Sequence, residues 1–155
     1  MAASVFDSAL YAKLFATGET GRLFSDSAAI RAMLLVEGAL AKVQGALGVI
    51  PELSAAAIHR ASMEIQIDPG ALADATGING VSVPGLVAAF RAEMNAPEHA
   101  AYVHWGATSQ DIIDTALMQG RRRTRPFANG RTNLWTTGDA NNLGCCSRGV
   151  WCPFD

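Results

Sequence analysis

Between Asp26 and Leu47 the apolar residues recur at spacings of 3, 4, 3 and 4. They are Met33, Val36, Leu40, Val43 and Leu47. Because an α-helix turns once in about 3.6 residues, this spacing places them on one helical face. A serine or aspartate at 25–27 can cap the start of the helix, and Gly48 followed by Pro51 supplies a stop. The pattern predicts a helix across this stretch.

Shorter helical signals follow at 51–63, at 68–77, from Val83 to before Pro97, and from Asp111 onward. Pro84 fits the first turn of its helix, where its missing N–H costs nothing. Between two of these segments, Ile78-Asn79-Gly80 predicts a turn, because Asn and Gly tolerate positive φ. No segment alternates convincingly with the period of two that a half-buried strand requires. The sequence therefore predicts an all-α architecture.

The helical pattern stops after Gly120, where Arg121-Arg122-Arg123-Thr124-Arg125-Pro126 leads into a Gly/Asn/Thr/Trp/Cys mixture without periodicity. Charge changes at the same place, with 6 Lys and Arg against 12 Asp and Glu up to Gln119, and 6 Arg against 2 Asp beyond it. We expect a helical segment at 1–119 and an irregular or disordered basic tail at 120–155. The break falls inside an amphipathic run, which favours a changed reading frame or a truncation. The alternative is a natural tail whose arginines contact nucleic acid or acidic lipid.

The amino-acid composition is typical of a globular protein. A chain of 155 residues can form one ordinary domain, and 50% hydrophobic with 17% charged residues is typical of a globular protein. No apolar run approaches the roughly 18 residues of a membrane span. The N-terminus lacks a basic stretch followed by a continuous apolar one, so we expect no secretory signal and a cytoplasmic protein.

Candidate chemistry lies at His104-Trp105-Gly106-Ala107-Thr108-Ser109-Gln110-Asp111, directly before a predicted helix. A helix N-terminus has unpaired N–H groups and partial positive charge, and it can hold a carboxylate without a basic side chain. Thr108 and Ser109 add hydroxyl donors, Gln110 an amide, and His104 a ring that can donate or shuttle a proton. Read locally, Thr108-x-x-Asp111 is a loose capping box that only caps the N-terminus of the helix.

The segment from His104 to Ile112 closely resembles the first signature region of the fumarase/aspartase superfamily. With Tyr102 and Val103 in front of it, it looks most like the 3-carboxy-cis,cis-muconate cycloisomerase branch. Stretches 31–41, 47–51 and 83–87 are similar to the same branch, so the resemblance covers about 1–119.

The resemblance implies an N-terminal helical segment of the fumarase/aspartase-like fold. It implies that Thr108 and Ser109 hydrogen-bond a substrate carboxylate and that His104 also contacts the substrate, with Gln110 and Asp111 in the same binding segment. It relates Asn79-Gly80-Val81-Ser82 to a second substrate-facing loop, which brings Asn79 and Ser82 into the substrate-binding set. An ordinary turn at Asn79 and an ordinary N-cap at Ser82 are the alternatives.

The implied reaction adds one carboxylate of a tricarboxylate diene across a double bond, giving a lactone in protocatechuate (β-ketoadipate) breakdown. The implied partner is a small polycarboxylate, with no metal, organic cofactor, membrane or nucleic acid. The adjacent cysteines Cys145 and Cys146 do not have the spacing of a usual metal clip.

Family members are homotetramers with a long central helical bundle, for which this chain has no room. Their mobile acid/base loop and a further signature region are also missing from the sequence, so no catalytic residue is assigned. A sister lyase, such as adenylosuccinate lyase, and a non-catalytic helical fragment remain as alternative functions.

Overall fold

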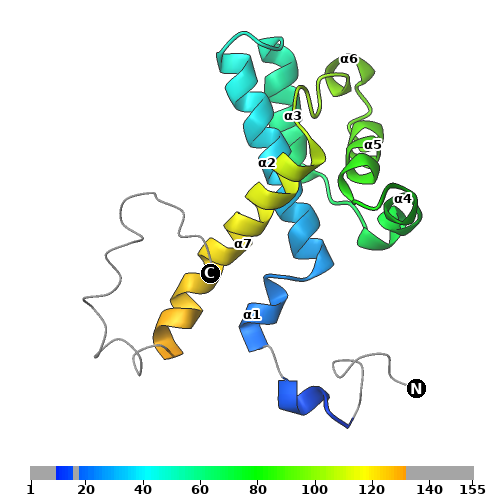
Figure 1. Ribbon diagram of the computed structural model, residues 1–155. Coiled ribbons are helices and arrows are strands. Elements are labelled where there is room, and N and C mark those ends of the chain that lie inside the picture. The colour runs from blue at the N-terminus through cyan, green and yellow to red at the C-terminus, as the bar shows by residue number, and fades with distance from the viewer. Residues whose placement is uncertain (1–9, 16–17, 132–155) are drawn as a thin grey trace, which may run out of the picture. The chain divides into compact units, whose positions relative to one another are not determined.

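A computed structural model describes residues 10–15 and 18–131. The chain divides into two compact units, Met1–Arg123 and Thr124–Asp155, and the fold described below is that of the first. Every regular element of the described residues is helical (Figure 1), in the order η1 (Ala12–Phe15), α1 (Gly18–Arg22), α2 (Asp26–Ala46), α3 (Glu52–Glu64), η2 (Pro69–Leu72), α4 (Ala73–Asn79), α5 (Val83–Glu93), α6 (Pro97–Ala100) and α7 (Ser109–Arg131). The all-α prediction is confirmed.

Helix α2 is the predicted long helix, and its boundaries follow from its caps. Ser25 is the N-cap, with its side chain accepting from the Ala28 N–H at 3.3 Å. After the helix, Gly48 adopts a φ of 70°, a left-handed conformation that glycine reaches without strain. The burial differs from the predicted stripe, because Leu47 is exposed while Leu34 and Glu37 on a neighbouring face are buried. Helix α2 therefore contributes more than one face to the core.

Helices α2 and α3 pack against one another along their lengths (Figure 1). Small residues bring the two backbones close together. A Cβ added to Gly38 would fall on Ser62 Oγ, and one added to Gly45 would fall on the Cβ of Ala55. Arg31 further joins the pair, since its guanidinium donates to the Ser62 carbonyl at 2.6 Å and to the Met63 carbonyl at 2.8 Å. These carbonyls lie at the end of α3, where the helix itself leaves them without partners.

The segment predicted at 68–77 forms two elements, the 3-10 turn η2 and helix α4. Helix α4 continues to Asn79, two residues past the predicted end at Gly77, and stops where Gly80 turns with a φ of 72°. Glycine at 77 is tolerated inside a helix at a modest energetic cost, whereas the left-handed turn at 80 ends it. Helix α5 begins with Pro84 in its first turn and ends before Pro97, as predicted.

Helix α7 begins at Ser109, two residues before the predicted start at Asp111, because Thr108 and Asp111 cap it. It also continues past Gly120 to Arg131, into the segment expected to be irregular. Arginine has a high helix propensity, which supports this continuation through Arg121, Arg122 and Arg123. Cys145 and Cys146 lie outside the described residues.

The hydrophobic core gathers side chains from α2, α3, α5 and α7 and from the chain before α7. Its most deeply buried members are Leu34, Ile58, Val83, Leu86, Phe90, Val103 and Ile112. In the part of the chain that the structure describes, no helix is long and apolar enough to cross a membrane.

Candidate carboxylate-binding site

Three hydrogen bonds between Thr108 and Asp111 form the start of α7. The Thr108 N–H and hydroxyl both donate to Asp111 Oδ2, at 2.9 and 3.0 Å, and the Asp111 N–H donates to the Thr108 hydroxyl oxygen at 3.4 Å. These hydrogen bonds, followed by the charge of His104, hold the pKa of Asp111 below its ordinary value. The capping box predicted from the sequence is confirmed.

His104 precedes this helix in a strained backbone conformation and is paired with a buried carboxylate. Its φ is 62°, in the left-handed region that costs a non-glycine residue about 1–2 kcal/mol. Its Nδ1 lies 2.6 Å from Glu37 Oε1, and the side chains of His104 and Glu37 are 18% and 1% exposed. Glu37 comes from the middle of α2, 67 positions earlier. The site thus joins the end of one loop to the centre of the longest buried helix.

Burial also changes the proton affinity of this pair. Desolvation raises the pKa of Glu37, because removing water destabilises the ionised form. The hydrogen bond and charge of His104, and to a smaller extent the charge of Arg91, oppose this rise without cancelling it. Glu37 Oε2 is buried and has no hydrogen-bond partner among the described residues.

The residues on either side of His104 are held by side chains from two other helices. Arg91 of α5 donates to the Val103 carbonyl at 2.8 Å. Gln44 of α2 donates to the Trp105 carbonyl at 2.7 Å. Together with Glu37, these side chains bind three consecutive residues, 103–105, in the loop that leads to α7. We call Glu37, Gln44 and Arg91 the clamp residues.

The other predicted binding residues make local contacts. Gln110 donates its side-chain amide to Asp114 Oδ1 at 2.6 Å. Ser109 opens α7, whose geometry leaves the first backbone N–H groups without partners inside the helix. Asn79 donates its side-chain amide to the Ala75 carbonyl at 2.8 Å. Ser82 is the N-cap residue of α5, yet its hydroxyl points to Met33 Sδ at 3.9 Å and not to the helix.

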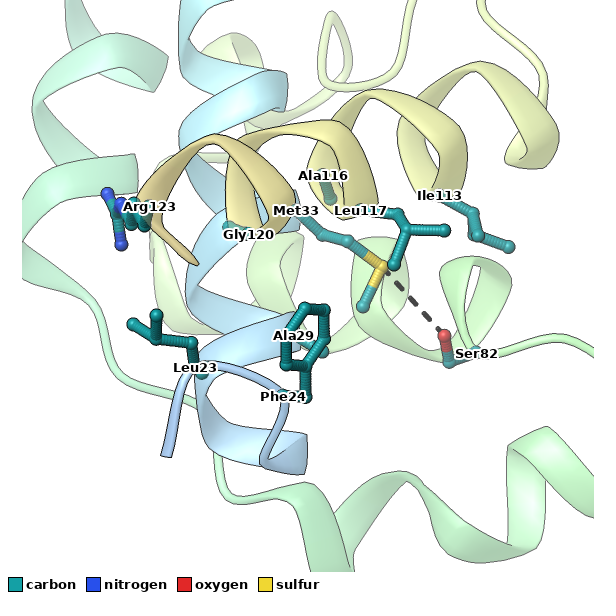
Figure 2. A pocket seen from close by; sticks show the side chains of 12 residues that line it. Leu23, Phe24, Ala29, Met33, Ser82, Ile113, Ala116, Leu117, Gly120 and Arg123 are labelled. Atoms are coloured by element: carbon teal, nitrogen blue, oxygen red, sulfur yellow. Dashed lines mark hydrogen bonds between the residues drawn. The ribbon is translucent and has the colours of Figure 1, made fainter. Parts of the chain in front are cut away.

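The structure therefore brings His104, Thr108, Ser109, Gln110 and Asp111 together at one helix start. Ser82 instead lines a pocket of about 310 Å³ between the first half of α2 and the middle of α7 (Figure 2). Its walls are mainly apolar, including Phe24, Met33 and Leu117, and no residue of 104–111 contributes to them. Such a lining does not suit a polyanion, so the helix start is the better candidate site.

Sequence reasoning missed the three clamp residues. Glu37 carried a usable signal, since it lies between Leu34 and Ala41 on a face of α2 that is otherwise apolar. A carboxylate buried there needs a partner, although the sequence does not reveal which one. Among the described residues, no group of three His, Cys, Asp or Glu side chains could hold a metal ion.

The sequence of the chain is similar to those of known enzymes. The chain is 46% identical over 115 residues to the 3-carboxy-cis,cis-muconate cycloisomerase of Acinetobacter baylyi, which covers 72% of this chain and 26% of that protein. It is 42% identical over 123 residues to nitrosuccinate lyase of Streptomyces davaonensis, covering 78% of this chain and 26% of that one. No family profile matches the chain.

Solved structures agree with the sequence comparison. The crystal structure of β-carboxy-cis,cis-muconate cycloisomerase from Acinetobacter calcoaceticus sp. ADP1 superposes with a TM-score of 0.74 at 39% identity, covering 80% of this chain and 30% of that one. The described helices are thus the N-terminal helical segment of a fumarase/aspartase-like fold. Over about three quarters of its length the chain is similar to a segment of 3-carboxy-cis,cis-muconate cycloisomerases and of related lyases. It spans about a quarter of the length of the curated relatives that it matches.

Proposed function

We propose that the chain carries the carboxylate-binding segment of a 3-carboxy-cis,cis-muconate cycloisomerase of protocatechuate breakdown. The observation that carries this proposal is the start of α7, where two hydroxyls, first-turn backbone N–H groups that have no partner inside the helix, and an imidazole gather at the positive end of a 23-residue helix. This arrangement suits an anion. The similarity to named cycloisomerases supports the choice of substrate.

In the proposed reaction, an oxygen of one substrate carboxylate bonds to a carbon of the diene. The carbon next to another carboxylate takes up a proton, and a lactone forms. Negative charge grows on that neighbouring carboxylate, so donors fixed around it stabilise the transition state more than the ground state. Ser109 and the first-turn N–H groups are the proposed donors, with Thr108 positioned by Asp111, and His104 and Gln110 beside them.

Asn79 and Ser82 belong to a second proposed substrate-facing loop. In the described residues Asn79 donates to the Ala75 carbonyl and Ser82 to Met33 Sδ, and the proposed site takes further residues from elsewhere. We propose that additional copies of the protein supply them, as in a homotetramer. The acid that delivers the proton is not assigned.

The test is to mix the purified chain with 3-carboxy-cis,cis-muconate and to record both the diene absorbance and the NMR signals of residues 104–111. Binding at these residues, with or without lactone formation, is the expected result. Absence of both binding and turnover would contradict the proposal.

A related lyase is the second candidate, because nitrosuccinate lyase is among the similar proteins. A lyase would cleave a succinate derivative and release an unsaturated dicarboxylate such as fumarate, and it would form no lactone. Parallel incubations with nitrosuccinate and with the carboxymuconate separate the two activities by their products.

A further inference from the structure

The His104–Glu37 pair combines two features that are costly for stability. His104 has a left-handed backbone, and Glu37 places a carboxylate among core residues of α2 with one oxygen unpartnered within the described residues. Each feature is destabilising when taken alone, the first through backbone strain and the second through desolvation. Residues kept in strained or desolvated states are concentrated at functional sites, so the pair is a candidate for a role in function.

The number of protons that the His104–Glu37 pair holds determines whether Nε2 of His104 is a hydrogen-bond donor or an acceptor. With a net charge of zero, either protonated Glu37 donates to a neutral ring at Nδ1, or an imidazolium donates from Nδ1 to ionised Glu37. In both arrangements Nε2 carries a hydrogen. Only loss of a further proton, which leaves a net negative charge buried in the core, turns Nε2 into an acceptor. Desolvation disfavours that state, and the raised pKa of Glu37 has the same cause.

Part of the His104 side chain remains exposed. Glu37, whose side chain is 1% exposed, pairs with Nδ1 of the ring, and the His104 side chain as a whole is 18% exposed. His104 is also close enough to Asp111 for its charge to lower the pKa of that carboxyl. Because Glu37 occupies Nδ1, Nε2 is the ring nitrogen that remains for a substrate carboxylate at the start of α7.

We propose that Glu37 is a positioning residue for His104, holding the Nδ1 edge of the ring so that Nε2 carries a hydrogen and donates to the substrate carboxylate. The hydrogen bond from Nε2 to the substrate carboxylate rests on the proposed function. The presence of a hydrogen on Nε2 does not depend on it. Arg91 and Gln44 complete the arrangement by fixing the carbonyls of Val103 and Trp105. The charged groups that act on the pair are Arg91 from α5 and Asp111 from α7.

The test uses the 155-residue chain with ¹⁵N-labelled histidine. The spectrum of His104→Asn identifies the His104 signals against those of His59 and His99. We expect Nε2 of His104 to carry a hydrogen in the folded chain, and 1,2,3-propanetricarboxylate, used as the probe, to shift this signal and not those of the other two histidines.

Glu37→Gln keeps the shape of the side chain and removes its acidity. Glutamine can either accept from Nδ1 or donate to it, so the ring should become a mixture of two neutral tautomers, with Nε2 only partly protonated. Affinity for the tricarboxylate should fall about twofold, because only the tautomer that carries a hydrogen on Nε2 can donate to the ligand. Glu64→Gln removes the same charge at an exposed position and should change neither the tautomer nor the affinity.

Two results would overturn the positioning role. One is an unprotonated Nε2 in the unmodified chain, which decides the matter even if Glu37→Gln loses its helical circular dichroism. The other is an unchanged His104 spectrum in folded Glu37→Gln, whatever happens to the affinity. If the unmodified chain shows the protonated Nε2 and the expected Glu37→Gln change but binds no tricarboxylate, the positioning role stands and the proposed carboxylate site fails.

Discussion

Thr108 caps α7 and is also a candidate to bind the substrate carboxylate, and both roles use the same N–H and hydroxyl hydrogens. Its N–H and hydroxyl hydrogen both point to Asp111 Oδ2, so the donors proposed for a substrate carboxylate are already engaged by a carboxylate of the chain. Ser109, one residue later, has no such engagement with Asp111. Substitutions at these two neighbours can therefore separate helix capping from ligand binding.

We predict that Ser109→Ala weakens binding of the carboxymuconate about tenfold while leaving the melting curve unchanged, because it removes one donor to a charged group. Thr108→Ala should weaken binding and also destabilise the chain by about 1 kcal/mol through loss of the cap. Titration calorimetry and thermal melts measure the two effects. Thr115→Ala, at an exposed position of the same helix, is the control, and equal binding by Ser109→Ala would remove Ser109 from the site.

A second residue-scale prediction concerns pH. Because the pKa of Glu37 is raised above its ordinary value of 4.5, the folded chain holds this proton more tightly than the unfolded chain. The stability that it contributes is fully present below pH 4.5 and is lost as the pH rises through the raised value. Asp111 has the opposite shift, and its contribution is lost only as the pH falls below 3.8.

Urea unfolding between pH 4 and pH 8 should accordingly show stability falling with pH in the unmodified chain and a flatter profile in Glu37→Gln. Glu64→Gln should retain the slope of the unmodified chain. Parallel profiles for all three proteins would mean that Glu37 does not carry the pH dependence.

The capping box was predictable because both of its residues lie within four positions of each other. The partner of Glu37 was not, since His104 is 67 positions away and only the docking of α2 against the loop before α7 brings them together. Gln44 and Trp105 are separated by 61 positions and were missed for the same reason. Sequence patterns report local geometry, and contacts between distant side chains depend on packing.

At the scale of elements, prediction succeeded where periodicity and caps agree, as in α2, α3 and α5. It was less accurate at boundaries set by a single residue. Glycine at 77 suggested a stop, but the chain turns at Gly80, and α7 continues through an arginine run that has no apolar period. Tertiary packing and intrinsic helix propensity determine where α4 and α7 end.

The α2–α3 contact gives a prediction about glycine. Gly38→Ala should destabilise the chain by about 1–3 kcal/mol, because its Cβ would overlap Ser62 Oγ and the gain in helix propensity is smaller, at most about 1 kcal/mol. Gly77→Ala is the matched control, since nothing lies within 4 Å of the added Cβ, and it should be neutral or stabilising. Urea unfolding of both variants measures the difference. Equal effects would show that the two helices do not pack this closely.

For the whole molecule, the all-α class and the family resemblance were both available from the sequence and are confirmed. The structure also shows which large apolar side chains are exposed on the surface. Four apolar side chains lie close together in sequence at the junction of α2 and α3, where Val43, Leu47, Val49 and Leu53 are 56%, 73%, 54% and 79% exposed. We call them the apolar tip.

We predict that the apolar tip makes the chain self-associate, since large exposed apolar side chains favour contact with another molecule. Leu47→Lys combined with Leu53→Lys should raise the concentration at which sedimentation first detects oligomers. Ile78→Lys, which changes an equally exposed residue of α4, should have a smaller effect. A chain that remains monomeric at all concentrations and melts cooperatively would contradict the prediction.

The clamp residues also affect how the protein folds. Two of the clamp contacts, those of Glu37 and Gln44, join residues 67 and 61 positions apart, and the conformational entropy lost in closing such loops favours their late formation, whereas Arg91 and Val103 are 12 positions apart. The capping box of α7 forms within a single helical turn and needs no such closure. Helix α7 can therefore begin early in folding, while His104 reaches its left-handed conformation only after α2 and α5 have docked. The ring of His104 is thus a natural spectroscopic probe of the last step.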